Sequence, residues 1–288
     1  MKRFSTLPVF LSMVAFDEEA LDSVGIVMIA TNNYLNLWKM SVQSLEKKFN
    51  FSGISISVYL FTDQAKEATS WIEAHLSKIK VTVIEVPNYK WPEATLIRYR
   101  LVVESQNLFT EPILMYLDSD MEVLNDFGRQ LLQEIDGNRM CLVMHPGYAP
   151  GAGRWDTWFK SPHILLRDLK ILFLGQIQPG AWERRKVSKA YVPRRKRKTY
   201  VHGAIWLGLR SEFIQMCKIL SERIDIDHAN SVIAVWHDES HLNWFAANYE
   251  VKYLDSRFSW HRDYKNLRDV IPFITTFDKD NQLFKKDQ

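Results

Sequence analysis

Two aspartates one residue apart, Asp118 and Asp120, are the first candidates for chemistry in this sequence. They follow residues 113–117, an apolar run typical of a buried strand in a parallel sheet. Open α/β sheets bind ligands at the carboxyl ends of such strands. Two carboxylates on one tight turn can hold magnesium or manganese and leave positions open for diphosphate oxygens. The pattern favours a sugar-nucleotide site, although an Asp-x-Asp turn is also typical of an ordinary loop or helix cap.

A second dense cluster occupies residues 236–243, Trp-His-Asp-Glu-Ser-His-Leu-Asn, at the start of an apolar helix. Asp238 and Glu239 could be ordinary first-turn acids, which favour the positive end of a helix dipole. His237 and His241 lie four residues apart, on one helical face, and could ligate a metal. The zinc-protease pattern His-Glu-x-x-His is not present, so this sequence disfavours zinc.

A basic stretch covers residues 184–198, within residues 151–198, which lack clear periodicity. It could be a solvated loop, an anion site for a diphosphate or an acidic lipid, or a nucleic-acid surface. No RNA- or DNA-binding motif accompanies it, so we expect no nucleic-acid partner. A long loop in a compact domain is usually functional, and we expect a peripheral membrane contact through this basic loop.

Strand and helix patterns alternate through the first part of the chain, which predicts a parallel sheet covered on both faces. The expected strands are residues 24–30, 54–61, 81–86 and 113–117, and the expected helices are residues 34–49, 67–77 and 93–104. Neither G-x-G-x-x-G nor a P-loop motif is present, so neither a dinucleotide fold nor a P-loop enzyme is supported. Beyond residue 124 we expect helices at 126–135 and 212–224, strands at 140–144 and 200–208, and the helix that opens near 236.

The composition is that of an ordinary globular protein of 288 residues, with 37 basic and 34 acidic side chains and a net charge of +3. Cys141 and Cys217 fall in an expected strand and helix, where they act as small core residues rather than as a disulfide. The longest apolar run near the amino terminus, residues 7–16, is about half the length needed to cross a bilayer. We therefore expect a soluble protein.

Taken together, these residues resemble the retaining glycosyltransferases of family 6, the group of the histo-blood-group A and B transferases and α1,3-galactosyltransferase. The similarity runs from about residue 24 to residue 260, and the order of its five short segments is specific. They are Phe-Thr-Asp-Gln at 61–64, Asp-Ser-Asp at 118–120, His-Pro-Gly at 145–147, residues 183–185 with 190–193, and residues 236–243.

The resemblance implies an α/β GT-A-type single domain with a mixed central sheet. Its Rossmann-like, UDP-sugar-binding half would be residues 24–124, and its acceptor-binding and catalytic half residues 125–262. Residues 1–23 would be an N-terminal extension and residues 263–288 a C-terminal tail.

The resemblance also assigns donor contacts. Ile29, Ala30 and Tyr34 would hold the uridine, with the Tyr34 ring stacked on the base. Asp118 and Asp120 would bind manganese, or alternatively magnesium, bridging the UDP phosphates. The remaining expected donor contacts are Arg98, Ser119, His202, Gly203 and Ala204. The His-Gly-Ala sequence at 202–204 is similar to that of galactose-using members, because a side chain there leaves less room for an acetamido group.

Glu239 would be the catalytic carboxylate beneath the anomeric carbon, and His145, Trp236 and Asp238 would contact the acceptor. The implied reaction moves galactose from UDP-galactose to the 3-hydroxyl of a β-galactoside glycan, with retention and an α1,3 linkage. Two alternatives are an α1,3-N-acetylgalactosaminyltransferase that uses UDP-GalNAc and a non-catalytic nucleotide-sugar-binding protein of the same fold.

The lack of an anchor and stem predicts a cytoplasmic bacterial or phage-type enzyme, soluble or peripheral. A location in the Golgi lumen would apply only if an anchor precedes these residues.

Overall fold

The computed structural model of the protein describes residues 22–51, 53–135, 139–148, 166, 180–261 and 271–277. The expected N-terminal extension, most of residues 151–179 and much of the C-terminal tail therefore lie outside the described residues.

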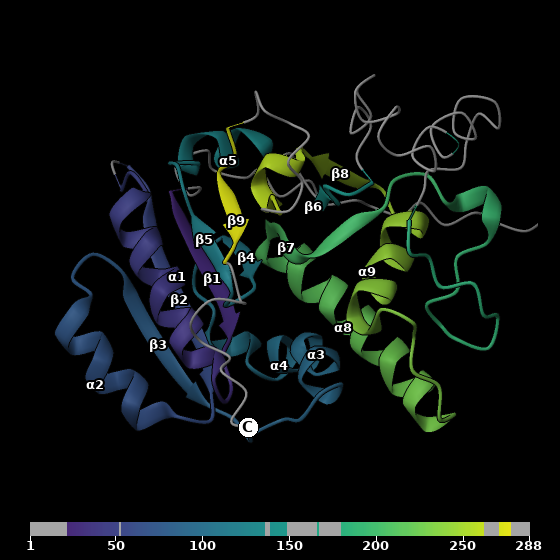
Figure 1. Ribbon diagram of the computed structural model, residues 1–288, viewed down its shortest axis with the longest axis horizontal. Helices are drawn as coiled ribbons and strands as arrows, with labels where there is room; N and C mark the ends of the chain where they lie inside the picture. Colours follow the sequence, from purple (N-terminus) through teal and green to yellow (C-terminus); the bar gives the residue numbers. More distant parts are fainter. Residues whose placement is uncertain are drawn as a thin grey trace, which may run out of the picture.

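A seven-stranded mixed sheet with strand order β3-β2-β1-β4-β7-β6-β8 forms the centre of the molecule (Figure 1). Its first four strands are parallel and comprise β1 (Ser23–Ile29), β2 (Ser55–Thr62), β3 (Lys80–Glu85) and β4 (Ile113–Leu117). The other strands are β7 (Val201–Leu209), antiparallel to β4, then β6 (Met140–Met144), antiparallel to β7, and β8 (Val251–Leu254), parallel to β6. This confirms the predicted α/β fold with a mixed central sheet in a GT-A-like single domain.

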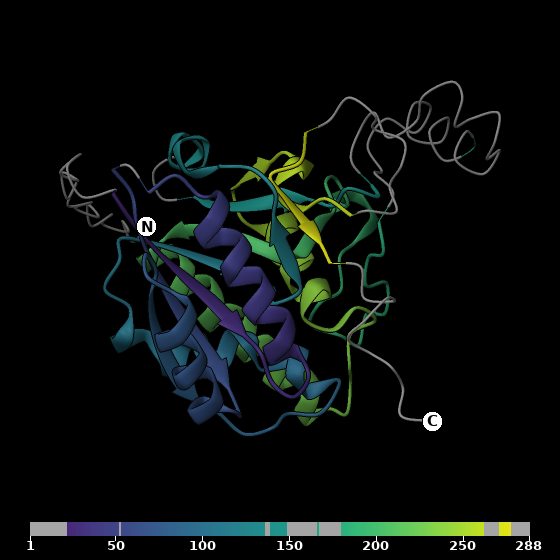
Figure 2. The same cartoon turned by 60° about the vertical axis from the view of Figure 1, so that its left-hand side comes forward.

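Helices cover both faces of the sheet, as Figures 1 and 2 show for α1 and α8 on opposite sides. One face packs against α1 (Tyr34–Lys48), α2 (Ala65–His75) and α5 (Gly128–Glu134). The other packs against α4 (Arg98–Glu104), α8 (Arg210–Ala229) and α9 (His237–Asn248). Neighbouring residues of a strand alternate between the two cores, because successive side chains point to opposite faces.

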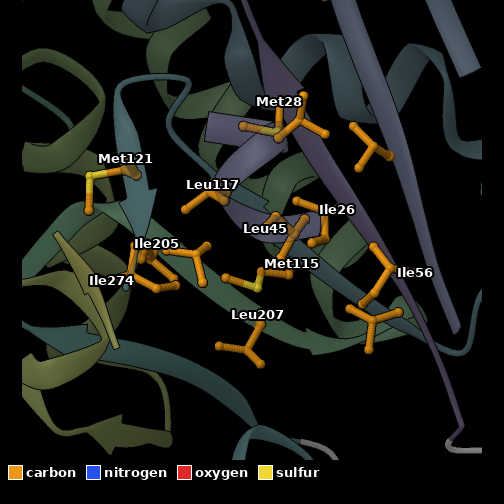
Figure 3. Close-up of a cluster of buried hydrophobic side chains, with 14 of the residues drawn as sticks. Ile26, Met28, Leu45, Ile56, Met115, Leu117, Met121, Ile205, Leu207 and Ile274 are labelled. Carbon is orange, nitrogen blue, oxygen red and sulfur yellow. The ribbon is translucent and has the colours of Figure 1, made fainter. Parts of the chain in front are cut away.

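The first of these cores contains a group of packed aliphatic side chains beneath α1 (Figure 3). Met115 and Leu117 of β4 meet Ile26 and Met28 of β1 there, and Leu45 of α1 covers them. All five side chains are 1% exposed or less. Burial on this scale fixes where β4 ends, and so fixes the position of the Asp-Ser-Asp turn that follows it.

Most predicted elements are confirmed within a few residues, with two differences. The single helix expected over residues 93–104 is present as two short helices, α3 (Glu93–Leu96) and α4, which meet at Ile97. The helix expected over residues 212–224 runs on to Ala229 as part of α8, since Ile224 and Asp227 keep a buried face beyond its predicted end. Cys141 and Cys217 are free and buried, as expected.

A small second sheet pairs β5 (Met121–Val123) with β9 (Ile274–Thr276) in antiparallel register. β5 directly follows Asp120, and the Phe277 backbone N–H donates to the Asp120 carbonyl at 2.9 Å. The far end of the chain therefore supports the aspartate turn. Within the part of the chain that the structure describes, short 3-10 helices are present at Gln106–Leu108, Arg194–Lys196 and Ser256–Ser259.

Candidate active site

The Asp-Ser-Asp turn lies where β4 meets β7. Because β7 is antiparallel to β4, with Leu117 opposite Ile205, the start of β7 lies beside the carboxyl end of β4. The Asp118 backbone N–H donates to the Ala204 carbonyl at 3.0 Å, and the Ser119 hydroxyl donates to the Ile29 carbonyl at 2.5 Å. Topology thus brings three separate predicted segments to one edge of the sheet.

A pocket of about 580 Å³ opens at this edge and contains six of the predicted donor contacts. These are Ile29, Tyr34, Arg98, Asp118, Ser119 and Asp120. Ala30 does not line this pocket; it is fully buried, and its N–H donates to the Phe61 carbonyl at 2.8 Å. Tyr34 lines the pocket and is 39% exposed, so an aromatic side chain is available there to contact a planar base.

The sequence analysis missed several residues of this pocket. Tyr89, Lys90 and Trp91 line it from the loop after β3, and Ala94 and Thr95 line it from α3. The signal available in the sequence was positional: this loop follows the end of a parallel strand, at the same sheet edge as Asp118. Thr31, Asn32, Asn33 and Tyr116 complete the lining.

The turn from β1 to α1 is held by side chains of the predicted 61–64 segment. Asp63 accepts from the Asn32 backbone N–H at 3.0 Å, and the Gln64 amide donates to the Asn32 carbonyl at 2.8 Å. Asn32 has a positive φ of 54°, which asparagine tolerates better than most residues. Here this segment shapes the pocket wall and does not itself line it.

Arg98 connects the two halves of the site. Its guanidinium lies 3.0 Å from the Asp238 carboxylate and 3.5 Å from that of Asp118, and it donates to the Gly203 carbonyl at 3.2 Å. The side chain is 10% exposed, and its pKa is well above the usual value because neighbouring acids and tyrosines outweigh the opposing effect of burial. Arg98 is therefore a permanent cation between the aspartate turn and α9.

The two aspartates form a donor set of hard oxygens. Burial raises the pKa of Asp118 to about 6; Arg98 opposes the rise, and repulsion from Asp120 adds to it. The Tyr116 hydroxyl donates to Asp118 at 2.8 Å, which orients that carboxylate. Two mutually repelling carboxylates on one turn fit a divalent cation such as Mn²⁺ or Mg²⁺.

Glu239 is held by two hydrogen bonds at the far side of Arg98. Its carboxylate accepts from the Tyr200 hydroxyl and from the Gly203 backbone N–H, each at 2.8 Å. Burial raises the pKa of Glu239 to about 7, although both hydrogen bonds oppose that rise. Asp238 beside it is 6% exposed and its pKa is also raised by burial. Both residues do lie in the first turn of α9, where Asp238 is buried and Glu239 is partly buried.

α9 is placed on β7 by Asn243, the last residue of the predicted cluster. Its side chain accepts from the Val201 N–H at 2.8 Å and donates to the Val201 carbonyl at 2.9 Å, as a backbone strand would. The side chain is 1% exposed. Trp236 lies immediately before α9, and its backbone N–H donates to the Ser240 hydroxyl at 3.0 Å. Trp236 is 54% exposed.

His145 and His202 lie together on the other side of Glu239. Their ring centroids are 4.8 Å apart, and the His145 ring also contacts Tyr148 and Tyr200. Burial lowers the pKa of His145 to about 4 and that of His202 to about 3, so both rings are neutral at pH 7. His202 is fixed by a 2.5 Å hydrogen bond between its Nδ1 and the Ser259 hydroxyl.

His145, His202 and Glu239 also offer three candidate ligand atoms within 4.8 Å of one another. Nδ1 of His145 accepts from the Gly147 N–H at 3.1 Å. The proton of the neutral ring must then lie on Nε2, which makes that nitrogen a hydrogen-bond donor rather than a metal ligand. The chemistry of Asp118 and Asp120 suits a divalent cation better than this triad does.

The histidine pair considered as a zinc site does not converge. The His241 ring is buried, with Nε2 3.5 Å from Asp227, whereas the His237 ring packs edge-on against Trp91 at 4.9 Å. Among the described residues, no group of three potential metal ligands includes either histidine.

Comparison with known proteins shows which class of protein this chain is similar to. A family model described as Glycosyltransferase family 6 matches residues 168–283. The chain is 24% identical over 243 residues to the histo-blood group ABO system transferase 1 of Rattus norvegicus, covering 83% of this chain and 61% of the relative. It is 26% identical over 258 residues to the globoside alpha-1,3-N-acetylgalactosaminyltransferase 1 of Gallus gallus, with 85% and 66% covered.

A bacterial relative aligns over nearly its whole length. The O-antigen biosynthesis glycosyltransferase WbnI of Escherichia coli is 24% identical over 249 residues, which cover 86% of this chain and 92% of the relative. The chain spans less than two thirds of the length of the rat and chicken relatives. These matches confirm the resemblance to glycosyltransferase family 6. In the part of the chain that the structure describes, no helix is both long and apolar enough to span a membrane.

Proposed function

We propose that this chain is a metal-dependent, retaining glycosyltransferase that moves galactose from UDP-galactose to the 3-hydroxyl of a β-galactoside-containing glycan. One observation carries the proposal: Arg98 joins Asp118, Asp238 and the backbone beside Glu239 into a single cluster at the end of the pocket. These residues, more than one hundred positions apart in the chain, would then face one bound nucleotide sugar. Arg98 and Asp118 line the pocket itself, whereas Asp238 and Glu239 lie beyond its lining.

The proposed donor lies along the 580 Å³ pocket, with uracil at Tyr34 and the sugar towards Arg98. Asp118 and Asp120 would hold Mn²⁺, with Mg²⁺ as the alternative, and such an ion supplies Lewis-acid neutralisation of charge on the departing diphosphate. Lys90, a lining residue not foreseen from the sequence, adds a cation near the phosphates. Arg98 would orient the sugar, and its charge opposes the rise in the pKa of Asp238 that burial causes.

Glu239 supplies the charge that retention requires. As the bond between the anomeric carbon and the UDP oxygen breaks, the electron pair leaves with UDP and positive charge develops on the sugar carbon. The Glu239 carboxylate stabilises that charge, either by bonding transiently to carbon or as an ion during attack from the same face. The acceptor oxygen then bonds to that carbon, and its proton passes to an oxygen of the departing UDP phosphate. Asp238, His145 and Trp236 would orient the acceptor.

The choice of galactose rests on His202. Its ring is hydrogen-bonded to Ser259 and packs against His145, and we propose that a side chain held in this way limits the space for an acetamido group. His202 does not itself line the 580 Å³ pocket. The alternative donor, UDP-GalNAc, is favoured by the name of the chicken relative, a globoside α1,3-N-acetylgalactosaminyltransferase. Offering equal concentrations of both donors with lactose, and reading the products by mass spectrometry and linkage analysis, decides between them. A product that contains only N-acetylgalactosamine would remove the galactose assignment.

A non-catalytic binding protein is the rival from another class. With UDP-galactose and lactose, the enzyme should release UDP, and Glu239→Gln should lower that rate by roughly 10²-fold or more while UDP binding stays within a few-fold. The matched control is Glu222→Gln, which removes the charge of an exposed glutamate on α8. Equal rates in wild type and Glu239→Gln would overturn the assignment, and no UDP release from wild type would favour the binding protein.

A further inference from the structure

The basic stretch lies at the surface of the folded protein. Residues 184–198 contain nine lysines and arginines and no acid, three times the net charge of the whole chain. We call the exposed cations Arg184, Lys186, Lys189, Arg194, Arg195 and Lys198 the basic face. The segment lies beside α8 and α9, on the opposite side of the molecule from α1 and α2 (Figure 1).

The other three cations of the stretch have partners. Arg185 binds the Glu183 carboxylate at 2.6 Å, Lys196 donates to the Asn248 amide at 2.6 Å, and Arg197 donates to the Val192 carbonyl at 2.9 Å. The pKa of Arg197 is lowered by burial and by the nearby charges of Arg184 and Arg194. Arg184 and Arg194 therefore both lie near Arg197. Among the described residues, no carboxylate pairs with any of the six cations of the basic face within 4.0 Å.

The backbone beneath these cations is fixed rather than loose. Asp227 of α8, 2% exposed, accepts from the Ser188 hydroxyl and from the Lys189 N–H, each at 2.6 Å. Glu183, also 2% exposed, accepts from the Val235 N–H at 2.9 Å. A charged surface held in this way loses little conformational entropy on binding, because its backbone is already ordered.

Apolar side chains stand among the cations. Val187 is 69% exposed between Lys186 and Lys189. A groove of about 530 Å³ runs from Arg195 and Lys198 to Tyr249 and Tyr253, which are 45% and 36% exposed. Glu250 at its edge is the one acid in its lining. Cations interspersed with an exposed aliphatic tip and tyrosines fit the headgroup region of a bilayer, where charge and apolar surface are both satisfied.

The basic face is also continuous with the candidate active site. Lys198 is two residues before Tyr200, whose hydroxyl donates to Glu239, and the Trp182 ring packs on Tyr200 with centroids 5.1 Å apart. An anionic surface bound at the basic face would therefore adjoin the side of Glu239 occupied by His145.

We propose that the basic face docks the protein on an anionic lipid bilayer, and that the acceptor glycan is presented from that surface. The second half of this statement rests on the proposed function, and the first half does not. Lipid is favoured over nucleic acid because Val187 and the groove tyrosines offer apolar contact, and because no base-reading motif accompanies the charges.

Flotation with vesicles tests the docking directly. Wild type should float with phosphatidylcholine vesicles that contain phosphatidylglycerol, remain behind with pure phosphatidylcholine, and lose binding as salt is raised. The triple variant Arg194→Gln, Arg195→Gln, Lys198→Gln should lower the vesicle-bound to free ratio by more than tenfold. The matched control Lys47→Gln, Lys48→Gln, Lys66→Gln removes the same charge from exposed positions on α1 and α2 and should change that ratio less than twofold.

Several outcomes would overturn the proposal. These are equal flotation of both triple variants, no preference of wild type for anionic vesicles, and complete release by soluble glycerol phosphate or by single-stranded RNA at the same phosphate concentration. Unchanged melting temperatures show that the variants fold. UDP release with lactose in solution should remain at the wild-type rate in the basic-face variant. If wild type floats but releases no UDP, the docking stands and only the proposed function fails.

Discussion

At the scale of single residues, Glu239 is distinguished by its environment rather than by its type. It is one of two adjacent helix-start acids, yet it lies between a phenol and a backbone amide, with a pKa of about 7. Because this pKa is above the ordinary value of 4.5, the carboxyl is protonated below about pH 7 and ionised above it. The proposed role requires the ionised form.

We therefore predict that the transfer rate rises with pH, with a midpoint at about pH 7. One pH unit below that midpoint, the rate should be roughly tenfold lower than its plateau value at high pH. Tyr200→Phe removes a hydrogen bond that stabilises the ionised carboxylate, so the midpoint should move upward by roughly one pH unit. The measurement is kcat/KM against pH for wild type, Tyr200→Phe and the control Tyr191→Phe. A midpoint that does not move in Tyr200→Phe, or moves equally in both variants, would contradict the assignment.

Gly203 illustrates a residue whose role is the space it leaves. A Cβ at this position would lie 3.2 Å from Cβ of Glu239 and 3.3 Å from its Oε2, closer than ordinary contact. We predict that Gly203→Ala shifts the carboxylate by a few tenths of an ångström and lowers kcat about tenfold, with UDP affinity changed less than about threefold.

The control for this prediction is Gly208→Ala on the same strand. Its added Cβ would meet the flexible Met140 side chain, with Sδ at 2.7 Å, and is far along β7 from Glu239. Steady-state kinetics and isothermal titration with UDP distinguish the two variants. Equal losses of kcat in both would show that β7 tolerates no added methyl group, rather than that Gly203 positions Glu239.

At the scale of elements, Asn243 is one of the side chains that hold α9 against β7, together with Glu239. Asn243 makes three hydrogen bonds, two of them to Val201 and one to the Glu239 carbonyl. Asn243→Ala would leave the buried N–H and C=O of Val201 without partners, which costs about 2–4 kcal/mol of unfolding free energy.

Urea denaturation measures this cost, with Asn248→Ala as the matched control. Asn248 is exposed at the end of the same helix and should contribute less than about 1 kcal/mol. A loss of the same size in both variants would mean that helix propensity, not the bond to β7, decides the stability of α9.

The elements were more predictable from the sequence than the site. Apolar runs such as residues 113–117 and the periodic helix 34–49 have strong local patterns, and the structure places β4 and α1 there. The break at Ile97 and the extension of α8 to Ala229 depend on tertiary packing, which no local pattern records. Boundaries therefore moved where buried contacts outweigh local preference.

The site was predictable only where its residues fall in recognisable motifs. Asp118, Asp120 and Glu239 do, and the structure brings them near one another through Arg98 and Gly203. Trp91 does not: it is an aromatic in a turn, and only the fold shows it lining the pocket. Trp236 is exposed and does not line the pocket, so its expected contact with the acceptor stays a prediction.

At the scale of the whole molecule, charges of opposite sign are concentrated in two separate regions. The basic face at residues 184–198 presents cations to solvent, whereas the Asp118 and Asp120 turn gathers anions at the edge of the sheet. A diphosphate bound at the aspartate turn would add still more negative charge there. The pocket therefore needs a counter-charge beyond Arg98, which already faces Asp238 and Asp118.

We accordingly predict that UDP and Mn²⁺ stabilise the whole protein together and only weakly apart. At one hundred times its dissociation constant, a ligand that binds only the folded state adds about 2.7 kcal/mol, which for a chain of this size raises the melting temperature by roughly 5 °C. EDTA should abolish the shift caused by UDP, and Asp118→Asn with Asp120→Asn should do the same. Asp63→Asn alters the pocket wall without removing a proposed metal ligand, and this variant should keep most of the melting-temperature shift that UDP causes. A full UDP-dependent shift in EDTA would show that the aspartate turn binds no metal, and the cation at the diphosphate would then have to be Lys90 or Arg98.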